Sequence, residues 1–373
     1  MSLFGAIKPP DQPDAVVQNT QTDGISALAW SPTADLLAVG SWSNQVRVFE
    51  VGPNGQNQGR CQYTHEGPVL DVAWSKDGTK IVSGGADNAG RVYDLATGQT
   101  TQFAAHDAPI RCIKWLDIPG SPMVVTGSWD KTLRYWDMRQ PTPAAQVQLP
   151  ERCYTLDVTY PLMVVGTAER HCLIFNLNQP TTPFKTMTSP LKMQTRSLAT
   201  FPDGDGYAIT SVEGRVAIQY VDDAKSSNNF SFKCHRADIS KTPGFKTGSQ
   251  SVYAINEISF HPLGTFSTAG SDGVIKCVKA HVTVNDRAMY VDAGYSCFFW
   301  NSMWDHTSRT RLKTWTLNEG SVTATDFSRT GQYLAYAISY DWSKGHNGNV
   351  PNHPNKVCIH TCTEDEVKKR PKK

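Results

Sequence analysis

The chain of 373 residues contains no run of about 18 apolar residues, the length that a helix needs to cross a membrane. Residues 1–6 lack both a basic start and an apolar core, so we expect no secretory signal. The sequence has no glycine-rich phosphate loop with a lysine, no His-Glu-x-x-His pair and no nucleophile elbow. These absences argue against an enzyme, so we expect no catalytic residues, no cofactor, no small-molecule substrate and no membrane insertion.

Cysteine is neither abundant nor arranged in pairs. The nine cysteines are an odd number and stand mostly alone, several of them inside apolar strand patterns. This usage predicts an intracellular, reduced protein with buried thiols and without disulfides. Cys358, His360 and Cys362 have a spacing that invites a zinc site, because cysteine and histidine are the usual zinc ligands. No second pair lies at ligand spacing, so we expect no metal and interpret this segment as the last strand and its exit.

The chain also lacks a strong charge of either sign. Its net charge is +2, and five positive charges lie in the last six residues, which leaves −3 for the remainder. The body of the protein is therefore not expected to bind nucleic acid through bulk charge. The basic residues from Lys368 to Lys373 fit an import signal, an RNA contact or mere solubility.

What the chain does contain is a repeat of about 40 residues. A short element, usually with glycine, precedes an aromatic residue by nine positions, and in the clearest copies an acidic residue follows the aromatic. The five copies are Gly40-Ser41 before Phe49-Glu50, Gly84-Gly85 before Tyr93-Asp94, Gly127-Ser128 before Trp136-Asp137, Gly166-Thr167 before Phe175-Asn176, and Ser211-Val212 before Tyr220-Val221. This period, with its Gly-Ser and Trp-Asp elements, is typical of β-propeller blades.

The repeat predicts an all-β fold, a seven-bladed WD-repeat β-propeller over residues 19–362. Residues 1–18 are polar and proline-rich and are expected to form a flexible tail, and residues 363–373 a basic tail. The alternation of apolar and polar residues in each blade indicates strands with one buried face. The predicted blades are Gly24–Phe49, His65–Asp94, His106–Asp137, Arg152–Asn176, Thr195–Tyr220, one that contains Ala254–Gly273, and Ser321–His360.

One blade departs from the repeat. Gly270 and the next aromatic-acidic pair, Trp304-Asp305, are separated by 34 positions instead of nine, so residues 274–303 form an anomalous insertion. A structureless insertion of this length within a compact repeat requires an explanation. It is either a functional loop or an unspliced intron. We favour the intron, because the sequence on both sides joins into a normal blade when the insertion is removed.

His106, Thr126, Asp130 and Trp136 resemble a catalytic set at first sight. His65, Ser83, Asp87 and Tyr93 occupy the same places one repeat earlier. A set that recurs with the repeat is expected to be a structural hydrogen-bond network that braces its blade, since buried polar groups need partners.

Large aromatic residues follow the Gly-Ser element in some blades. Trp42 and Trp129 stand there, and Tyr340 and Trp342 lie at the matching place of the last blade, whereas other blades have alanine. These turns should cluster at one end of a propeller. The rings then either form a partner-binding surface or cover the neighbouring blade, and we favour the partner-binding surface.

Arg309, Arg311 and Lys313 fall at alternate positions after Trp304-Asp305, and Arg236 belongs to the adjacent blade. Together they would suit an acidic peptide or phosphate. Alternatively, the charges protect a solvated edge strand.

Several longer runs go beyond the generic repeat. They are Trp30-Ser31-Pro32, residues 40–47, Phe232-Lys233-Cys234-His235-Arg236, residues 258–262, and Ser339-Tyr340-Asp341-Trp342-Ser343-Lys344-Gly345. Together they resemble the WD-repeat family of nuclear-pore messenger-RNA export factors over residues 20–362. A more distant resemblance links the chain to the spindle-checkpoint propeller of kinetochores.

The resemblance implies a propeller that binds the GLEBS segment of a GLFG nucleoporin and links messenger ribonucleoprotein to the nuclear pore. It implies a nuclear protein at the envelope that shuttles to the cytoplasm, with direct RNA contact left open. The partner-binding residues expected from the resemblance are Arg236, Trp304, Arg309, Arg311 and Lys313, and the turns add Trp42, Trp129 and Trp342. The insertion departs from the family and directly precedes the sixth-blade residues. The alternative function is a spindle-checkpoint scaffold that binds a similar motif in checkpoint kinases.

Overall fold

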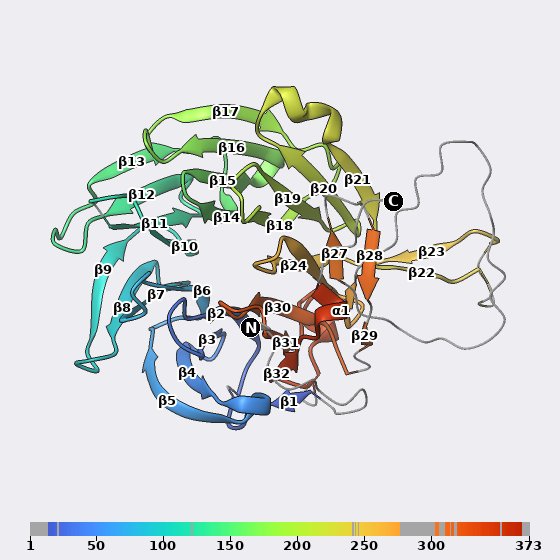
Figure 1. The fold of residues 1–373 in the computed structure, drawn as a ribbon, viewed down its shortest axis with the longest axis horizontal. Coiled ribbons are helices and arrows are strands. Elements are labelled where there is room, and N and C mark those ends of the chain that lie inside the picture. The colour runs from blue at the N-terminus through green and yellow to red at the C-terminus, as the bar shows by residue number, and fades with distance from the viewer. Residues whose placement is uncertain are drawn as a thin grey trace.

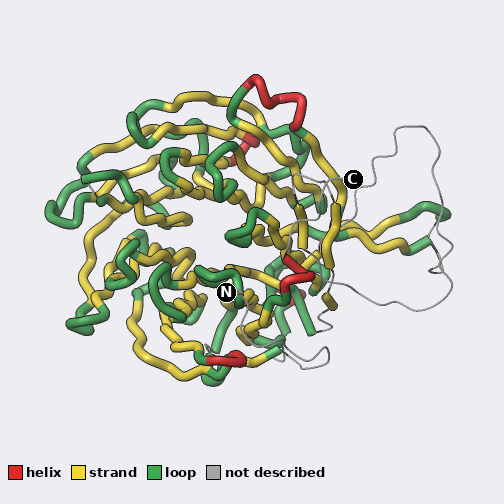
Figure 2. Tube along the Cα trace, in the orientation of Figure 1, coloured by secondary structure: helices red, strands yellow, loops and turns green. Residues whose placement is uncertain are grey.

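The computed structural model describes residues 14–20, 22–120, 122–240, 242, 244, 246–276, 303–305, 310–313, 315–316, 319–350 and 353–367. Within these residues the chain is built from β-strands, with helix confined to short segments (Figure 2). Most of the predicted N-terminal tail, Arg309, residues 277–302 of the insertion and the basic residues 368–373 lie outside the described residues.

The sheets are arranged around a central axis as the blades of a β-propeller (Figure 1). Five of them have four antiparallel strands that follow one another in the chain. Their strands are β2 Ile25–Trp30, β3 Leu36–Ser41, β4 Gln45–Val51 and β5 Asn57–Thr64; β6 Val69–Trp74, β7 Lys80–Gly85, β8 Ala89–Asp94 and β9 Thr100–Ala105; β10 Ile110–Leu116, β11 Met123–Ser128, β12 Thr132–Trp136 and β13 Ala145–Gln148; β14 Cys153–Thr159, β15 Leu162–Thr167, β16 His171–Asn176 and β17 Pro183–Thr188; and β18 Thr195–Thr200, β19 Gly206–Ser211, β20 Arg215–Tyr220 and β21 Phe230–Lys233.

The turns between the second and third strands explain why short strands can follow one another so tightly. Asn44, Asn88 and Lys131 occupy the same turn position in three blades and have φ angles of 66°, 64° and 66°. Asparagine tolerates this left-handed conformation better than most residues, so it suits a tight connection between antiparallel strands. The Gly-Ser element of the repeat therefore ends the second strand, and the turn reverses the chain.

A sixth four-stranded sheet joins the two ends of the described chain. It consists of β30 (Val322–Phe327), β31 (Tyr333–Ile338), β32 (Lys356–Thr361) and, at its outer edge, β1 (Ala15–Val16). Ala15 pairs with Ile359 and Val16 with Cys358. We call this sheet the closing blade. Residues at the end of the predicted tail thus add a strand to it.

The remaining large sheet has six strands, β24 (Ile255–Phe260), β25 (Thr265–Gly270), β26 (Val274–Lys276), β27 (Met303–Asp305), β28 (Thr310–Lys313) and β29 (Trp315–Thr316). We call it the interrupted sheet. Strand β24 packs between β18 and β30, the innermost strands of the neighbouring blades. The described residues thus form six regular four-stranded blades and the interrupted sheet, so the predicted total of seven depends on how this sheet is counted.

The interrupted sheet keeps its pairing register across the insertion. Thr268 of β25 pairs with Lys276 of β26, and the preceding residue, Ser267, pairs with Met303 of β27. Consecutive residues of β25 therefore meet residues 276 and 303 as if these were neighbours. Strands β26 and β27 together occupy the side of β25 that a single third strand takes in the regular blades.

The hydrophobic core lies between adjacent sheets rather than at the central axis. Leu37 and Phe49 of the first blade pack with Ala335 and Val357 of the closing blade in one buried cluster. Similar clusters join the other neighbours. None of the seven cysteines in the described residues forms a disulfide, and six of them are buried.

Candidate partner-binding face

A buried histidine fixes the turn that follows the second strand in three of the sheets. The His106 ring lies 2.7 Å from the Asp130 carboxylate through Nδ1 and 2.7 Å from the Thr126 hydroxyl through Nε2. Trp136 Nε1 donates to the same hydroxyl at 2.8 Å. Burial lowers the pKa of His106, and Asp130 only partly opposes this effect. A neutral histidine of this kind positions the turn that carries Trp129.

The same arrangement recurs outside the third blade. His65 contacts Asp87 and Ser83, and His235 contacts Asp272 at 2.9 Å and Thr268 at 3.1 Å. The His235 group belongs to the interrupted sheet, so this sheet has the same brace as the regular blades. Recurrence in three sheets assigns the group a structural role.

Three tryptophans are exposed at turns between second and third strands. Trp42, Trp129 and Trp342 expose 42%, 40% and 45% of their surfaces. The second strands of all blades run in the same direction along the axis, so these turns lie at one end of the propeller. We call this end the turn face. Tyr160 and Phe184 are exposed as well, so it is the gathering of exposed indoles at one end of the propeller, more than their exposure itself, that marks this face.

Two of these rings form a cluster across the boundary between the first and closing blades. The ring centroids of Trp42 and Trp342 are 6.2 Å apart, and those of Trp342 and Tyr340 are 5.7 Å apart. His353 stacks on Tyr340 at 4.8 Å. Such distances are typical of interacting aromatic pairs. Trp129 stands on the third blade, two blades away from Trp42.

The loop that carries Trp342 is held in a strained conformation. Trp342 has a φ of 59°, which a bulky side chain adopts at a cost of about 1–3 kcal/mol. The Tyr340 hydroxyl donates to the Gly345 carbonyl at 2.6 Å and accepts from the Lys344 amide. These bonds hold the loop so that the indole remains at the surface.

Two arginines line the channel at the same end. Arg111 and Arg196 are the second residues of β10 and β18, and Tyr154 has the equivalent place on the intervening β14. Arg196 donates to the Asn256 side chain, and Arg111 donates to the Leu70 carbonyl. Burial and the nearby charge of Arg111 lower the pKa of Arg196. The carboxylates of Asp341 and Glu257 oppose this shift, so two guanidinium groups and two carboxylates lie close together at the channel mouth.

Sequence reasoning missed these two arginines. The two arginines stand at the same place in their strands as Ser26, Leu70 and Tyr154, which also line the channel. Most blades have an uncharged residue there, and only the register of the strands shows that the two arginines converge.

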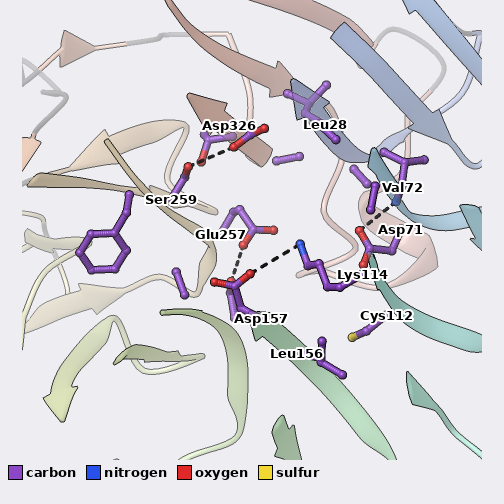
Figure 3. A pocket seen from close by; sticks show the side chains of 18 of the residues that line it. Leu28, Asp71, Val72, Cys112, Lys114, Leu156, Asp157, Glu257, Ser259 and Asp326 are labelled. Carbon is purple, nitrogen blue, oxygen red and sulfur yellow. Dashed lines mark hydrogen bonds and ion pairs between the residues drawn. The ribbon is translucent and has the colours of Figure 1, made fainter. Parts of the chain in front are cut away.

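The channel contains a cavity of about 580 Å³, which Arg111 and Arg196 line together with charged residues further along the innermost strands that brace the ring (Figure 3). Three aspartates on innermost strands each accept the backbone N–H of the next blade at 2.8 Å: Asp71 from Ile113, Asp157 from Thr200 and Asp326 from Trp30.

Lys114 lies 3.8 Å from Asp157 inside this cavity (Figure 3). Burial would lower the pKa of Lys114, but the surrounding carboxylates raise it. Burial raises the pKa of Asp326 to about 6. The charged groups deep in the channel are thus paired with one another and with backbone N–H groups.

The predicted cationic residues are distributed over two elements. Arg236 begins the hairpin of β22 (Arg236–Asp238) and β23 (Gln250–Val252), which projects from the ring (Figure 1). Its Nη2 donates to the Glu213 carbonyl at 2.9 Å. Trp304 and Arg311 face each other in the register of β27 and β28, and Lys313 pairs with Met303.

Comparison with protein-family models defines the class of the molecule. A model of the WD domain, G-beta repeat, matches residues 98–137, and a model of the anaphase-promoting complex subunit 4 WD40 domain matches residues 28–117. Together with the ring of sheets and the recurring histidine group, these matches define a WD40 β-propeller.

Full-length relatives define the family. The Poly(A)+ RNA export protein of Schizosaccharomyces pombe is 48% identical over 362 residues, which cover 96% of this chain and 94% of the relative. The mRNA export factor GLE2 of Chaetomium thermophilum is 49% identical over 363 residues (96% and 93%). Protein Rae1 of Drosophila melanogaster is 40% identical over 377 residues (99% and 99%). The chain belongs to the family of WD-repeat messenger-RNA export factors, as its sequence predicted. No helix in the described part is long and apolar enough to span a membrane.

Proposed function

We propose that this protein is a non-enzymatic messenger-RNA export factor. It binds the GLEBS segment of a GLFG nucleoporin on the turn face and links messenger ribonucleoprotein to the nuclear pore. Relatives named for RNA export support the export role. We propose accordingly that the protein acts in the nucleus and at the pore complex and shuttles to the cytoplasm. The observation that carries the binding site is the exposure of Trp42, Trp129 and Trp342 on one face.

The exposed rings can supply much of the binding energy. Each indole leaves roughly 100 Å² of apolar surface in water, and burying that area contributes about 2–3 kcal/mol. Interface hot spots are enriched in tryptophan and arginine that lie close together. The cluster of Trp42, Trp342 and Tyr340 meets this description.

Positive charge at the turn face favours a partner with acidic side chains. Arg111 and Arg196 at the channel mouth favour acidic side chains, because a guanidinium pairs well with a carboxylate. Arg236, Trp304, Arg309, Arg311 and Lys313 remain proposed contacts. Trp304 pairs with Phe266 near the start of β25, at the end of that strand away from the turn face, and Arg311 pairs with Trp304. A segment with both acidic and large apolar residues fits this combination.

We further propose that the interrupted sheet is the seventh blade. Its innermost strand packs between β18 and β30, and its third strand keeps one register through β26 and β27. The continuity at Lys276 and Met303 favours an unspliced intron over a functional loop. We propose that the propeller consists of residues 19–362 together with β1, which is the outer strand of the closing blade, and that α1 (Glu364–Val367) adds contacts.

The aromatic cluster is tested with the double variant Trp42→Ala/Trp342→Ala. We expect its affinity for a synthetic GLEBS peptide to fall at least about 30-fold, because two hot-spot rings are lost. Isothermal titration calorimetry measures the change. The control is Phe184→Ala, which removes a ring that is 67% exposed on the outer strand β17. Equal affinity of the double variant and the control would overturn the proposed site.

The cationic strand is tested with Arg311→Glu. A pull-down with the GLEBS peptide should lose the interaction, because charge reversal repels an acidic segment. Lys76→Glu reverses an exposed charge that pairs with Asp117 and should leave binding unchanged. Unaltered binding of Arg311→Glu would count against this strand as part of the site.

The alternative is a spindle-checkpoint scaffold that binds a similar motif in checkpoint kinases. The location of a tagged protein separates the two functions. A signal at the nuclear rim supports the export factor, and a signal at kinetochores supports the scaffold.

A further inference from the structure

The closing blade has a histidine where other blades have their aromatic residue. His360 of β32 pairs with Leu334, the second residue of β31. Phe49 pairs with the second residue of β3 in the same way, and Trp136 with the second residue of β11. The Trp-Asp position of the closing blade is therefore occupied by a titratable group.

Both nitrogens of His360 contact carboxylates. Nδ1 lies 2.7 Å from Asp14 Oδ1, and Nε2 lies 3.2 Å from Glu366 Oε2. His360 is 6% exposed and Glu366 is 2% exposed. A carboxylate oxygen accepts hydrogen bonds, so both ring nitrogens must donate for this geometry to hold. The arrangement therefore requires the doubly protonated, positively charged ring.

The groups around the His360 ring favour its protonated form. The Tyr336 hydroxyl of β31 donates to the other Asp14 oxygen at 2.8 Å, and the Thr363 amide donates to Glu366 at 2.7 Å. The buried Cys358 thiol of β32 lies next to Tyr336, and burial raises its pKa, so it adds no charge at neutral pH. Glu364, the first residue of α1, adds a further acidic group at this end of the chain.

Burial alone would lower the pKa of His360. The hydrogen bonds and charges of Asp14 and Glu366 outweigh burial and raise it. A doubly paired imidazolium is thus the form that this site stabilises.

The two carboxylates come from opposite ends of the described chain. Asp14 directly precedes β1, and Glu366 lies in α1, which packs against β27 and β28. The carbonyl of Val367 in α1 also accepts from the Thr265 hydroxyl at 3.1 Å. One imidazolium therefore fastens both chain ends to the closing blade.

We propose that protonated His360 is a pH-dependent latch that closes the propeller and releases β1 and α1 when it loses its proton. Since the pKa of His360 in the folded protein is raised above its ordinary value, the stabilisation is complete below that ordinary value. It is lost as the pH rises through the raised value. The neutral ring would keep one donor and leave the other carboxylate facing a lone pair.

Hydrogen exchange followed by mass spectrometry tests the latch on the full chain. After correction for intrinsic exchange, protection of the β1 and α1 amides in the wild type should fall as the pH rises above neutrality. His360→Gln should exchange these amides at least about tenfold faster at pH 7, and their protection should not depend on pH. His171→Gln, a half-buried histidine beside Glu169, is the matched control and should keep the wild-type profile.

Direct titration of the ring gives a second readout that a merely structural role would not move. By NMR, His360 should titrate above 6.5, and Asp14→Asn or Glu366→Gln should each lower its pKa. Titration of His360 at or below 6.5, or an identical pH profile in His360→Gln and the wild type, would overturn the latch.

Discussion

The third blade and the interrupted sheet share their brace and differ in their third strand. His106, Asp130 and Thr126 in one correspond to His235, Asp272 and Thr268 in the other. Strand β12 is continuous, whereas the equivalent strand of the interrupted sheet is divided between β26 and β27. The pairing register is nevertheless kept. The comparison shows that the brace and the pairing register of the third strand are both kept although this strand is divided in two.

The substitution Trp136→Ala should have the largest effect on the stability of the third blade. Trp136 is 3% exposed and donates to Thr126 from inside the blade. We expect a loss of about 3–5 kcal/mol in the free energy of unfolding, measured by urea titration. Trp129→Ala removes an exposed ring from the same blade and should change stability by less than about 0.5 kcal/mol. Similar losses in both variants would show that Trp136 is not a core residue.

Removal of the brace from each sheet sharpens the comparison. His106→Ala and His235→Ala should each cost about 2 kcal/mol, because a buried carboxylate and a buried hydroxyl lose their partner. Thermal unfolding of the two variants should give similar decreases in Tm. A large decrease for His106→Ala with none for His235→Ala would mean that the interrupted sheet is not held by its histidine.

Deletion of residues 277–302 should have the smallest effect of the three. The deletion joins Lys276 to Met303, whose partners on β25 are already adjacent. We expect cooperative unfolding to persist and the free energy of unfolding to rise by roughly 1 kcal/mol, because the chain between β26 and β27 becomes shorter and its ends cost less entropy to bring together. Calorimetry checks this expectation, and sequencing of the transcript across Gly273 and Trp304 tests the intron directly. A deletion variant that fails to unfold cooperatively would contradict the register argument.

The spacing of the repeat was sufficient to predict the successive strands of the regular blades and the structural sets of the second and third blades. Both depend on contacts between residues that are close in sequence. His106 and Asp130, for example, are 24 residues apart and recur with the repeat. The exposure of Trp42, Trp129 and Trp342 also followed, because alanine at the equivalent turns showed that a large ring is not needed for packing.

Contacts between distant residues could not be predicted in this way. Asp14 and His360 are 346 positions apart, and Ala15 and Val16 form a strand too short to give a periodic signal. The sequence suggested zinc or an ordinary strand for His360, and neither interpretation includes its two carboxylate partners. Arg111 and Arg196 were missed because their proximity depends on how seven innermost strands converge on the channel.

The shared sheet of β1 and β32 has a consequence for synthesis on the ribosome. Strand β1 is synthesised long before its partner β32, so the closing blade stays incomplete until β32 has emerged. Until then, β1 has no partner strand and the closing blade lacks its third strand. A product truncated before residue 356 would retain unpaired strand edges, which promote aggregation. Quality control of this protein should therefore act on incomplete chains more strongly than on point variants within a single blade.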